Sequence, residues 1–294
     1  MDYKENLSFP DIRNALYNGS SFREIRSNYV KSLRESGNIY HSIYANKLEE
    51  CANMVSLENL NELELEFHDF KEHMRKWAKE NHIKIILKRR QKDFLGLNEK
   101  IRLFLKTGKS LDKIQDLLGF RIILCTPKTD TSQSVELCYK VLNELITFFA
   151  LKKHCTFLEA EPTVNTSLEN IPNIFIPKKS MILDGFENNI KDYIIHPKKN
   201  GYQSLHMLIK KPNGLIFEVQ IRTFAMDLLA EYGSAHHAGH KQSRYQLPEE
   251  SDYLKDIMNI DYKKISLPGF SILDDGSIHD LVGLTTSIDP FNAL

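Results

Sequence analysis

The stretch that most constrains the fold of this chain is a pair of strand-like runs joined by a short turn. The runs are "SLHMLIKK" (204–211) and "GLIFEVQIRT" (214–223), and the turn holds Pro212, Asn213 and Gly214. An Asn-Gly pair between two runs rich in apolar and β-branched residues is a strong signal for a β-hairpin. We therefore predict two adjacent antiparallel strands in the second half of the chain.

The second strand of this hairpin carries polar side chains at alternate positions. They are Glu218, Gln220 and Arg222, and apolar residues separate them. Successive side chains of a strand point to opposite faces, so one face carries a carboxylate, an amide and a guanidinium in a row. Such a row is costly to bury unless it is paired. It fits either a wall that binds a ligand or the solvated face of a half-exposed strand, and the pattern alone leaves both open.

Helical and strand-like segments surround the hairpin. Residues 1–80 have apolar residues at helical intervals, and a second amphipathic helix ends at Gly108. "IKIILKRR" (83–90) and "FRIILCT" (120–126) predict two further strands. Residues 128–190 begin with a predicted helix and continue as a loop-rich insert. The chain therefore mixes helices and strands along its length.

Charge is balanced overall but uneven along the chain. The 294 residues include 39 Lys+Arg and 39 Asp+Glu. This zero formal net charge argues against a protein that coats nucleic acid without sequence preference, because such a protein needs an excess of basic residues. Residues 84–109 hold nine basic residues against two acids, a local balance of +7, whereas residues 248–294 hold nine acids against three lysines, a balance of −6. The basic segment indicates a local anionic ligand. For the C-terminal stretch we expect a flexible or loosely docked acidic tail.

The chain shows no pattern of export or membrane insertion. Its four cysteines lack CxxC spacing and suit reduced thiols. The N-terminus has no signal-peptide pattern, and no run approaches the ~18 apolar residues of a membrane span. We therefore expect a cytoplasmic protein. His236 and His240 are spaced like a helical metal-binding pair, but without a suitably placed glutamate they are weak evidence for zinc.

One acidic residue and three basic residues outside the hairpin are the remaining candidates for binding a metal or a phosphate. Asp116 precedes a predicted strand, so its carboxylate and that of Glu218 could hold one Mg²⁺ through hard oxygen ligands. Lys92 and Lys100 lie eight residues apart, about 80° around a helix, which places them on the same side of it. Together with Arg90 they suit phosphate binding. An ordinary turn acid and a solvated basic face would explain the same residues without a ligand.

Five specific segments follow one another between about residues 80 and 241. They are "RRQKDFLGLNEK" (89–100), "DLLGFRII" (116–123), "KDYIIHPKKNGYQSLH" (191–206), "EVQIRT" (218–223) and "AEYGSAHH" (230–237). Their content and order resemble the synthetase domain of the RelA/SpoT family, the alarmone (ppGpp) synthetases. The resemblance implies an α+β fold, with a nucleotidyltransferase-like mixed β-sheet flanked by helices. It divides the chain into an N-terminal helical region, a synthetase domain with an insert, and an acidic tail: 1–80, 81–245 (insert 128–190) and 246–294.

This resemblance also implies a reaction. The β,γ-pyrophosphoryl group of ATP would move to the 3′-hydroxyl of GDP or GTP and release AMP, which needs in-line positioning, a metal and cations around the developing charge. By their place in the motifs, Asp116 and Glu218 would hold Mg²⁺, and Glu218 would also activate the hydroxyl. The ATP side would be bound by Arg90, Lys92, Lys100 and Arg121.

Six side chains would hold the acceptor nucleotide according to the same resemblance. They are Lys198, Asn200, Tyr202, His206, Gln220 and Arg222. Tyr202 would stack on guanine, and Gln220 and Arg222 would support the wall beside Glu218. The first four occupy alternate positions, which on an extended chain face one side. We therefore predict that "PKKNGYQSLH" (197–206) is the loop that grips the acceptor.

The sequence also departs from the family pattern. Gly96 stands where a serine is usual, which puts one contact to the donor in question, and Ala238 stands where an aromatic residue is common. The length leaves no room for the hydrolase and ribosome-sensing domains of the long members. We therefore expect a small enzyme restricted to synthesis, and a dimer or tetramer as some small synthetases are.

Two other functions use the same features. Some toxic small members of the family pyrophosphorylate the 3′ CCA end of tRNA and pair with an antitoxin, and the basic segment suits tRNA as well as ATP. A catalytically silent nucleotide-binding module is the third interpretation. The joint presence of Asp116, Glu218 and Tyr202 weighs against that module.

Overall fold

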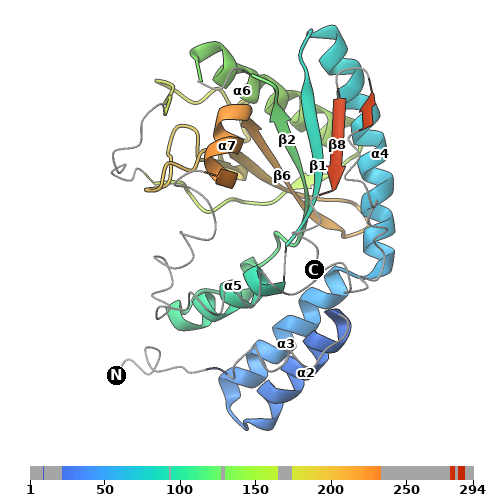
Figure 1. Ribbon diagram of the computed structural model, residues 1–294, viewed down its shortest axis with the longest axis vertical. Helices are drawn as coiled ribbons and strands as arrows, with labels where there is room; N and C mark the ends of the chain where they lie inside the picture. Colours follow the sequence, from blue (N-terminus) through green and yellow to red (C-terminus); the bar gives the residue numbers. More distant parts are fainter. Residues whose placement is uncertain are drawn as a thin grey trace.

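A mixed β-sheet forms the centre of the computed structural model, and helices lie around it (Figure 1). The structure describes residues 9, 22–92, 94–126, 130–164, 174–232, 279–281 and 284–288. Its strands are β1 (Ile85–Gln91), β2 (Leu118–Leu124), β3 (Thr156–Phe157), β4 (Ile190–Asp192), β5 (Leu205–Lys210), β6 (Ile216–Thr223), β7 (His279–Leu281) and β8 (Leu284–Ile288). Its α-helices are α2 (Phe22–Glu35), α3 (Ile39–Met54), α4 (Leu57–Glu80), α5 (Phe94–Thr107), α6 (Ser132–Thr147) and α7 (Phe224–Tyr232). The α+β class and the N-terminal helices are thus confirmed.

The strand order of the sheet explains how distant segments meet. Along the sheet the order is β3-β5-β6-β2-β1-β8-β7, and β4 pairs with β5. β2 lies at the centre, parallel to β6 and antiparallel to β1. β5 and β6 are antiparallel, and Gly214 in the turn between them has φ of 93°, a conformation that glycine adopts without steric cost. The predicted hairpin is therefore confirmed.

One face of the sheet is apolar and is covered by α4 and α6. The alternate apolar residues of β6, including Phe217, are fully buried there. Phe120 of β2 stacks on Phe70 of α4, with ring centroids 5.2 Å apart. α6 lies within the stretch 128–190 that the sequence marks as an insert, yet its apolar side chains belong to this core. The first part of that stretch is therefore integral to the sheet's packing.

A second apolar core lies between α5 and the helices α2 and α3. Tyr29 of α2, Tyr44 of α3, and Leu97 and Ile101 of α5 are buried together, in a cluster separate from the one beneath the sheet. Figure 1 shows α5 lying between the sheet and the α2–α3 pair. α5 follows β1 in sequence, but its packing partners come mainly from residues 22–54.

The strands β7 and β8 fall within residues 246–294, for which we expect a flexible or loosely docked tail. β8 pairs in parallel with β1, from Leu284 opposite Ile85 to Ile288 opposite Arg89. This part of the stretch is docked on the sheet, because the open edge of β1 offers unpaired backbone groups that a further strand can bind. The described part of the stretch extends the sheet.

Ion pairs fasten α4 to segments at the β5–β6 side of the sheet. Glu66 is buried and lies 2.7 Å from Lys211 and 3.6 Å from Lys153. Lys211 also pairs with Glu62, and Lys153 with Asp69, each at 2.5 Å. A buried charge with partners on two sides is costly to neutralise.

Neither α4 nor any other helix in the described ranges is both long and apolar enough to cross a membrane.

Replacing Glu66 by Gln should lower the free energy of unfolding by about 2 kcal/mol, because two lysines then lose a buried carboxylate partner. Urea denaturation measures the loss. Glu72→Gln is the matched control on the same helix, since it removes only an exposed pair with Arg75, worth less than about 1 kcal/mol. Equal losses in the two variants would show that the buried pairs add no stability.

Candidate active site

The second face of the sheet carries polar side chains from adjacent strands. Residues paired across neighbouring strands point to the same face, so each set of partners forms a row. The first row is Arg90, Gly119 and Glu218, from β1, β2 and β6. The second row is Lys88, Arg121, Gln220 and His206, from β1, β2, β6 and β5. Residues more than 100 positions apart in the chain thus meet on this face.

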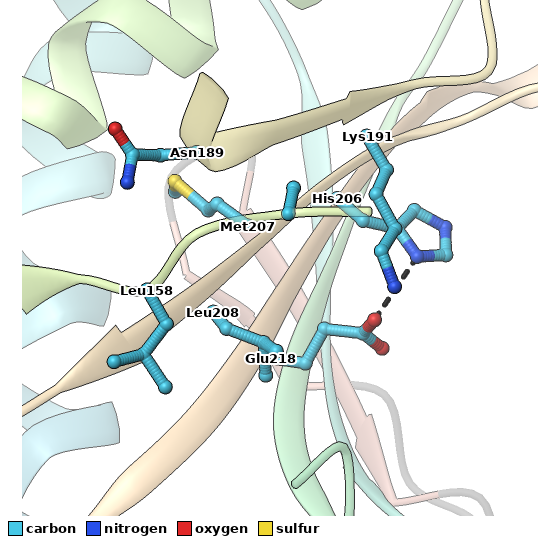
Figure 2. Close-up of a pocket in the computed structure, with 8 residues that line it drawn as sticks. Leu158, Asn189, Lys191, His206, Met207, Leu208 and Glu218 are labelled. Atoms are coloured by element: carbon cyan, nitrogen blue, oxygen red, sulfur yellow. Dashed lines mark hydrogen bonds and ion pairs between the residues drawn. The ribbon is translucent and has the colours of Figure 1, made fainter. Parts of the chain in front are cut away.

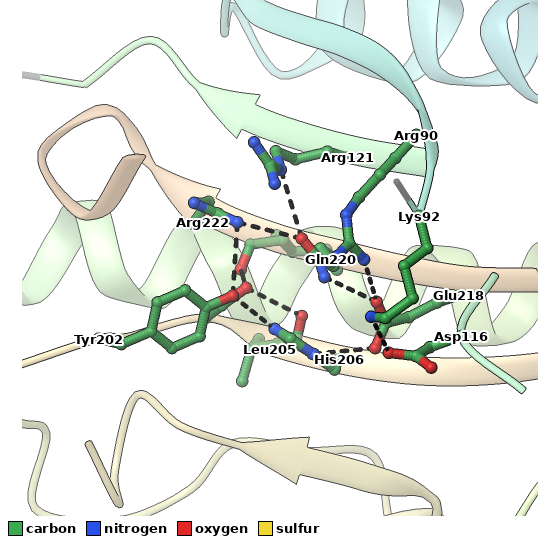
Figure 3. Close-up of polar contacts among 12 residues, drawn as sticks. Arg90, Lys92, Asp116, Arg121, Tyr202, Leu205, His206, Glu218, Gln220 and Arg222 are labelled. Atoms are coloured by element: carbon green, nitrogen blue, oxygen red, sulfur yellow. Dashed lines mark hydrogen bonds and ion pairs between the residues drawn. The ribbon is translucent and has the colours of Figure 1, made fainter. Parts of the chain in front are cut away.

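Glu218 has partners on three sides in these rows (Figure 3). Its Oε2 accepts hydrogen bonds from Arg90 at 2.9 Å and from Gln220 at 2.6 Å, and its Oε1 lies 3.0 Å from Nδ1 of His206. Only 8% of the side chain is exposed, so these partners replace the water that an ionised carboxylate needs. The alternative of a solvated strand face is therefore wrong for this part of β6.

Burial and neighbouring charges shift the pKa values of Glu218 and His206 in opposite directions. Burial alone would raise the pKa of the Glu218 carboxyl, but His206 and Arg90 lower that pKa below its usual value. Burial lowers the pKa of His206 to about 4, although Glu218 opposes the shift. At neutral pH we therefore assign an ionised Glu218 that accepts a hydrogen bond from Nδ1 of a neutral His206.

Gly119 is required by the close approach of β2 and β6. A methyl group at this position would lie 2.3 Å from the backbone oxygen of Glu218, well inside van der Waals contact. The missing side chain also leaves the row open, so that Arg90 on β1 reaches across β2 to Glu218. The sequence places this glycine in a motif. Glycine is needed there because β2 pairs with β6, and no local sequence pattern reveals that pairing.

Asp116 binds two lysines that come from different segments. Its Oδ2 accepts from Lys92 at 2.9 Å and its Oδ1 from Lys100 at 2.6 Å. The predicted convergence on one helix is wrong, because Lys92 precedes α5 and only Lys100 lies on it. Instead, a backbone hydrogen bond from Lys92 to Leu117, 2.7 Å long, brings Lys92 beside Asp116. Burial alone would raise the pKa of Asp116, but the two lysines hold it well below its usual range.

Asp116 and Glu218 are the two carboxylates that could hold a metal ion. The charge of Asp116 acts on Glu218, and both lie on the same side of the sheet (Figure 3). Within the described ranges no group of three or more His, Cys, Asp or Glu side chains is arranged to hold a metal. Two ionised carboxylates alone fit Mg²⁺, which commonly takes its other ligands from substrate phosphates and water.

The loop 197–206 turns sharply before it enters β5. Gly201 donates its backbone N–H to the carbonyl of Lys198 at 2.8 Å, and its φ is 80°. Oδ1 of Asn200 accepts from the backbone N–H of Tyr202 at 3.4 Å. The predicted extended chain is therefore wrong for the first half of the loop, because Asn-Gly forms a tight turn here as well.

The turn nevertheless brings predicted acceptor residues together. Nζ of Lys198 lies 4.7 Å from the ring centre of Tyr202 and 4.6 Å from that of Tyr193, which is cation–π range. The hydroxyl of Tyr202 lies 2.8 Å from Nε2 of His206, and His206 in turn contacts Glu218. Hydrogen bonds therefore connect the loop to the buried carboxylate.

Asp227 of α7 is a buried acid of this face that the sequence does not single out. It lies 3.2 Å from Arg222 and 3.7 Å from Arg121. Both arginines also donate to Oε1 of Gln220, at 3.0 and 3.3 Å. Arg121, which the resemblance assigns to the ATP side, therefore contacts Gln220 and Asp227, whereas the lysines of that side contact Asp116.

A hollow opens beside Glu218 and His206 (Figure 2). Its polar lining also includes Asn189 and Lys191. Lys191 of β4 is opposite His206 in the β4–β5 pairing, and within the described ranges its side chain forms no hydrogen bond or ion pair. This lysine is a cation at the site that the sequence analysis missed, because only the short strand β4 brings it there.

Of the remaining positions that the sequence singles out, only Gly96 lies within the described residues. Gly96 lies in the first turn of α5, on the segment that leads to Lys100. Ala238, His236 and His240 lie outside the described residues.

The segments that form this site also match a known protein family. A family model described as "Region found in RelA / SpoT proteins" matches residues 89–245, more than half of the chain. The chain belongs to the RelA/SpoT family. The matched range of this RelA/SpoT protein includes every residue of the two rows except Lys88, and also Asp116 and the loop 197–206.

Relatives within the RelA/SpoT family carry names from two reactions. The guanosine-3′,5′-bis(diphosphate) 3′-pyrophosphohydrolase of Spiroplasma citri is 32% identical over 194 residues, 66% of this chain and 20% of that protein. The GTP pyrophosphokinase of Streptomyces antibioticus is 31% identical over 160 residues, 54% of this chain and 14% of that protein. The matches thus span a fifth or less of these relatives. Among solved structures, small alarmone synthetase 2 from Bacillus subtilis is 22% identical, with a TM-score of 0.40, over 70% of this chain and 94% of that one.

Replacing Gly119 by Ala should lower the free energy of unfolding by about 3 kcal/mol, because the new methyl group collides with the backbone of Glu218. Urea denaturation measures the loss. Gly214→Ala is the control, since nothing lies within 4 Å of its added carbon and only its positive φ is unfavourable. If the first variant kept wild-type stability, the close approach of β2 and β6 would not require a glycine.

The pKa of His206 predicts a pH dependence of stability. His206 is held neutral in the folded protein with a pKa of about 4, whereas an unfolded histidine titrates near 6.5. Between those values the unfolded chain binds more protons, so stability falls as pH decreases from about 6.5 to 4.5, by about 2 to 3 kcal/mol from this residue. In urea unfolding at several pH values, His206→Gln should flatten this slope. His68→Gln, at an exposed histidine of α4, is the control; equal slopes in the two variants would contradict the assignment.

Proposed function

We propose that the protein transfers pyrophosphate from ATP to the 3′-hydroxyl of GDP or GTP, producing the alarmone (p)ppGpp and AMP. One observation carries this proposal: two ionised carboxylates, Asp116 and Glu218, lie on one side of the sheet, each bound by cations. Charged groups of both signs, held in fixed positions, are what phosphoryl transfer between nucleotides requires. The family match and the name of the Streptomyces antibioticus relative support the same activity.

The donor side of the proposed site consists of the basic side chains that contact Asp116 and Glu218. Lys92 and Lys100 now bind Asp116, and Arg90 binds Glu218. The phosphates of ATP would compete with the carboxylates for these cations, since charge-assisted hydrogen bonds to phosphate are strong. Mg²⁺, held by Asp116 and Glu218, would neutralise phosphate charge.

The acceptor side consists of the loop 197–206 and the wall formed by Gln220 and Arg222. A guanine base stacked on Tyr202 would take the place of the Lys198 ammonium, which would then turn toward the acceptor's phosphates. Asn200 and His206 would bind the sugar and phosphates. Lys191 lines the hollow beside Glu218 and would add a further cation for the acceptor.

Glu218 would accept the proton in this reaction. The acceptor's 3′-oxygen attacks the β-phosphorus of ATP, the bond from that phosphorus to the oxygen of AMP breaks, and the hydroxyl proton passes to Glu218. The low pKa of Glu218 makes it a weak base while Arg90 is bound to it. When Arg90 turns to the donor's phosphates, one of the charges that lowers this pKa is removed, so donor binding would activate the base.

Incubation with ATP labelled at the β-phosphate tests the proposal. Label should appear in ppGpp or pppGpp when GDP or GTP is present, with one AMP released for each transfer. Glu218→Gln should lower kcat by roughly 10²-fold or more, whereas Glu80→Gln, at an exposed glutamate at the end of α4, should leave it unchanged. Label on deacylated tRNA would instead support the toxic type, and transfer to neither acceptor would support a silent module.

A further inference from the structure

The two halves of the proposed site are attached to different cores. On the donor side, Lys100 lies on α5, which packs with α2 and α3. On the acceptor side, the loop 197–206 leads into β5, whose Leu205 and Met207 belong to the core beneath the sheet. Asp116 receives one lysine from α5 and another from the end of β1. The position of Lys100 relative to the sheet therefore depends on what holds α5.

A buried tyrosine of α3 binds α5 on the side away from the site. The hydroxyl of Tyr44 lies 3.1 Å from the carbonyl oxygen and 2.5 Å from Oδ1 of Asn98. Asn98 and Lys100 are two positions apart, about 200° around the helix, so Tyr44 and Asp116 contact opposite sides of α5. Tyr44 is fully buried, and an edge contact with Tyr29 at 5.8 Å holds its ring.

The acceptor side has a comparable tyrosine on α6. The hydroxyl of Tyr139 donates to the carboxylate of Asp192, at 2.9 and 3.1 Å from its two oxygens. Ser180 and the backbone N–H groups of Ile194 and Ile195 donate to the same carboxylate, at 2.8 to 3.1 Å. Asp192 thereby fixes the turn that leads from β4 into the acceptor loop.

The residue that follows Asp192 is Tyr193, whose ring contacts side chains of the acceptor loop. Tyr193 forms edge contacts with Tyr202 at 6.0 Å and with His206 at 5.3 Å, and Nζ of Lys198 lies over its ring. Its backbone N–H binds the carbonyl of Ser204 at 3.0 Å. A shift of Asp192 would therefore move residues of the acceptor side, while Lys92, Lys100 and Asp116 lie on other segments.

We propose that Tyr44 and Tyr139 are positioning residues that set the two halves of the site separately. Tyr44 holds α5 so that Lys100 faces the donor's phosphates, and Tyr139 holds Asp192 so that the acceptor loop keeps its shape. The hydroxyls of Tyr44 and Tyr139 bind Asn98 and Asp192, which are not assigned to bind substrate, so both tyrosines act through another side chain. This inference rests on the proposed function.

Steady-state kinetics with each substrate varied in turn test the inference. Loss of one buried hydrogen bond corresponds to a roughly 2- to 12-fold change in an equilibrium. Tyr44→Phe should therefore raise KM for ATP about 3- to 10-fold and leave KM for GDP within about twofold. Tyr139→Phe should produce the reverse. Tyr40→Phe is the control on α3, because the Tyr40 hydroxyl forms no hydrogen bond within the described ranges.

Calorimetric titration with ATP and with GDP, each with Mg²⁺, separates this inference from the proposed function. If the wild type binds both nucleotides but transfers nothing, the proposed function fails, and the affinities of the two variants still decide the inference. Equal weakening of both nucleotides in both variants, or no weakening in either, would overturn it. Urea midpoints for all three variants show whether a change reflects the site or the stability of the fold.

Discussion

An ionised carboxylate can be buried only if donors or cations replace its water, and this requirement organises the site around Glu218. Its three partners come from β1, β5 and β6: Arg90, His206 and Gln220. They reach it only because the strand order places β5 and β2 on either side of β6 and β1 beyond β2. Gly119 then leaves the space through which Arg90 passes. The polar face of the sheet is thus a consequence of one buried charge and the strand order that satisfies it.

The same electrostatic requirement joins the two cores of the protein. Asp116 precedes β2, and its two oxygens bind a lysine from the end of β1 and a lysine from α5. The sheet and α5 therefore meet at a charged site, while the buried apolar residues of the sheet and those of α2, α3 and α5 form two clusters. In the proposed function, this arrangement would let α2 and α3 affect the donor side through α5, while Asp192 and the sheet hold the loop 197–206.

Local signals account for what could be predicted. The Asn-Gly turn, the alternation in β6 and the helical spacing before residue 80 each involve neighbours in sequence, and each prediction is confirmed. Contacts between segments that are distant in sequence are harder to predict. Lys92 and Lys100 do meet, but at Asp116 and from different segments. The Asn-Gly pair at residues 200–201 forms a turn, where the sequence predicts an extended chain. The sequence does not single out Lys191 and Asp227, because strand pairing and a following helix bring them to the site.

Local patterns in the sequence are enough to predict the polar face of β6, the hairpin that contains this strand, and the basic segment at residues 84–109. Family motifs in the sequence also named most of the residues that meet on the sheet. The packing of the folded chain shows which of these groups neutralise one another, why a glycine must stand between Arg90 and Glu218, and that α5 packs with α2 and α3. The physical reason is that side-chain direction follows a two-residue local period, whereas charge pairing depends on register between strands that are distant in sequence.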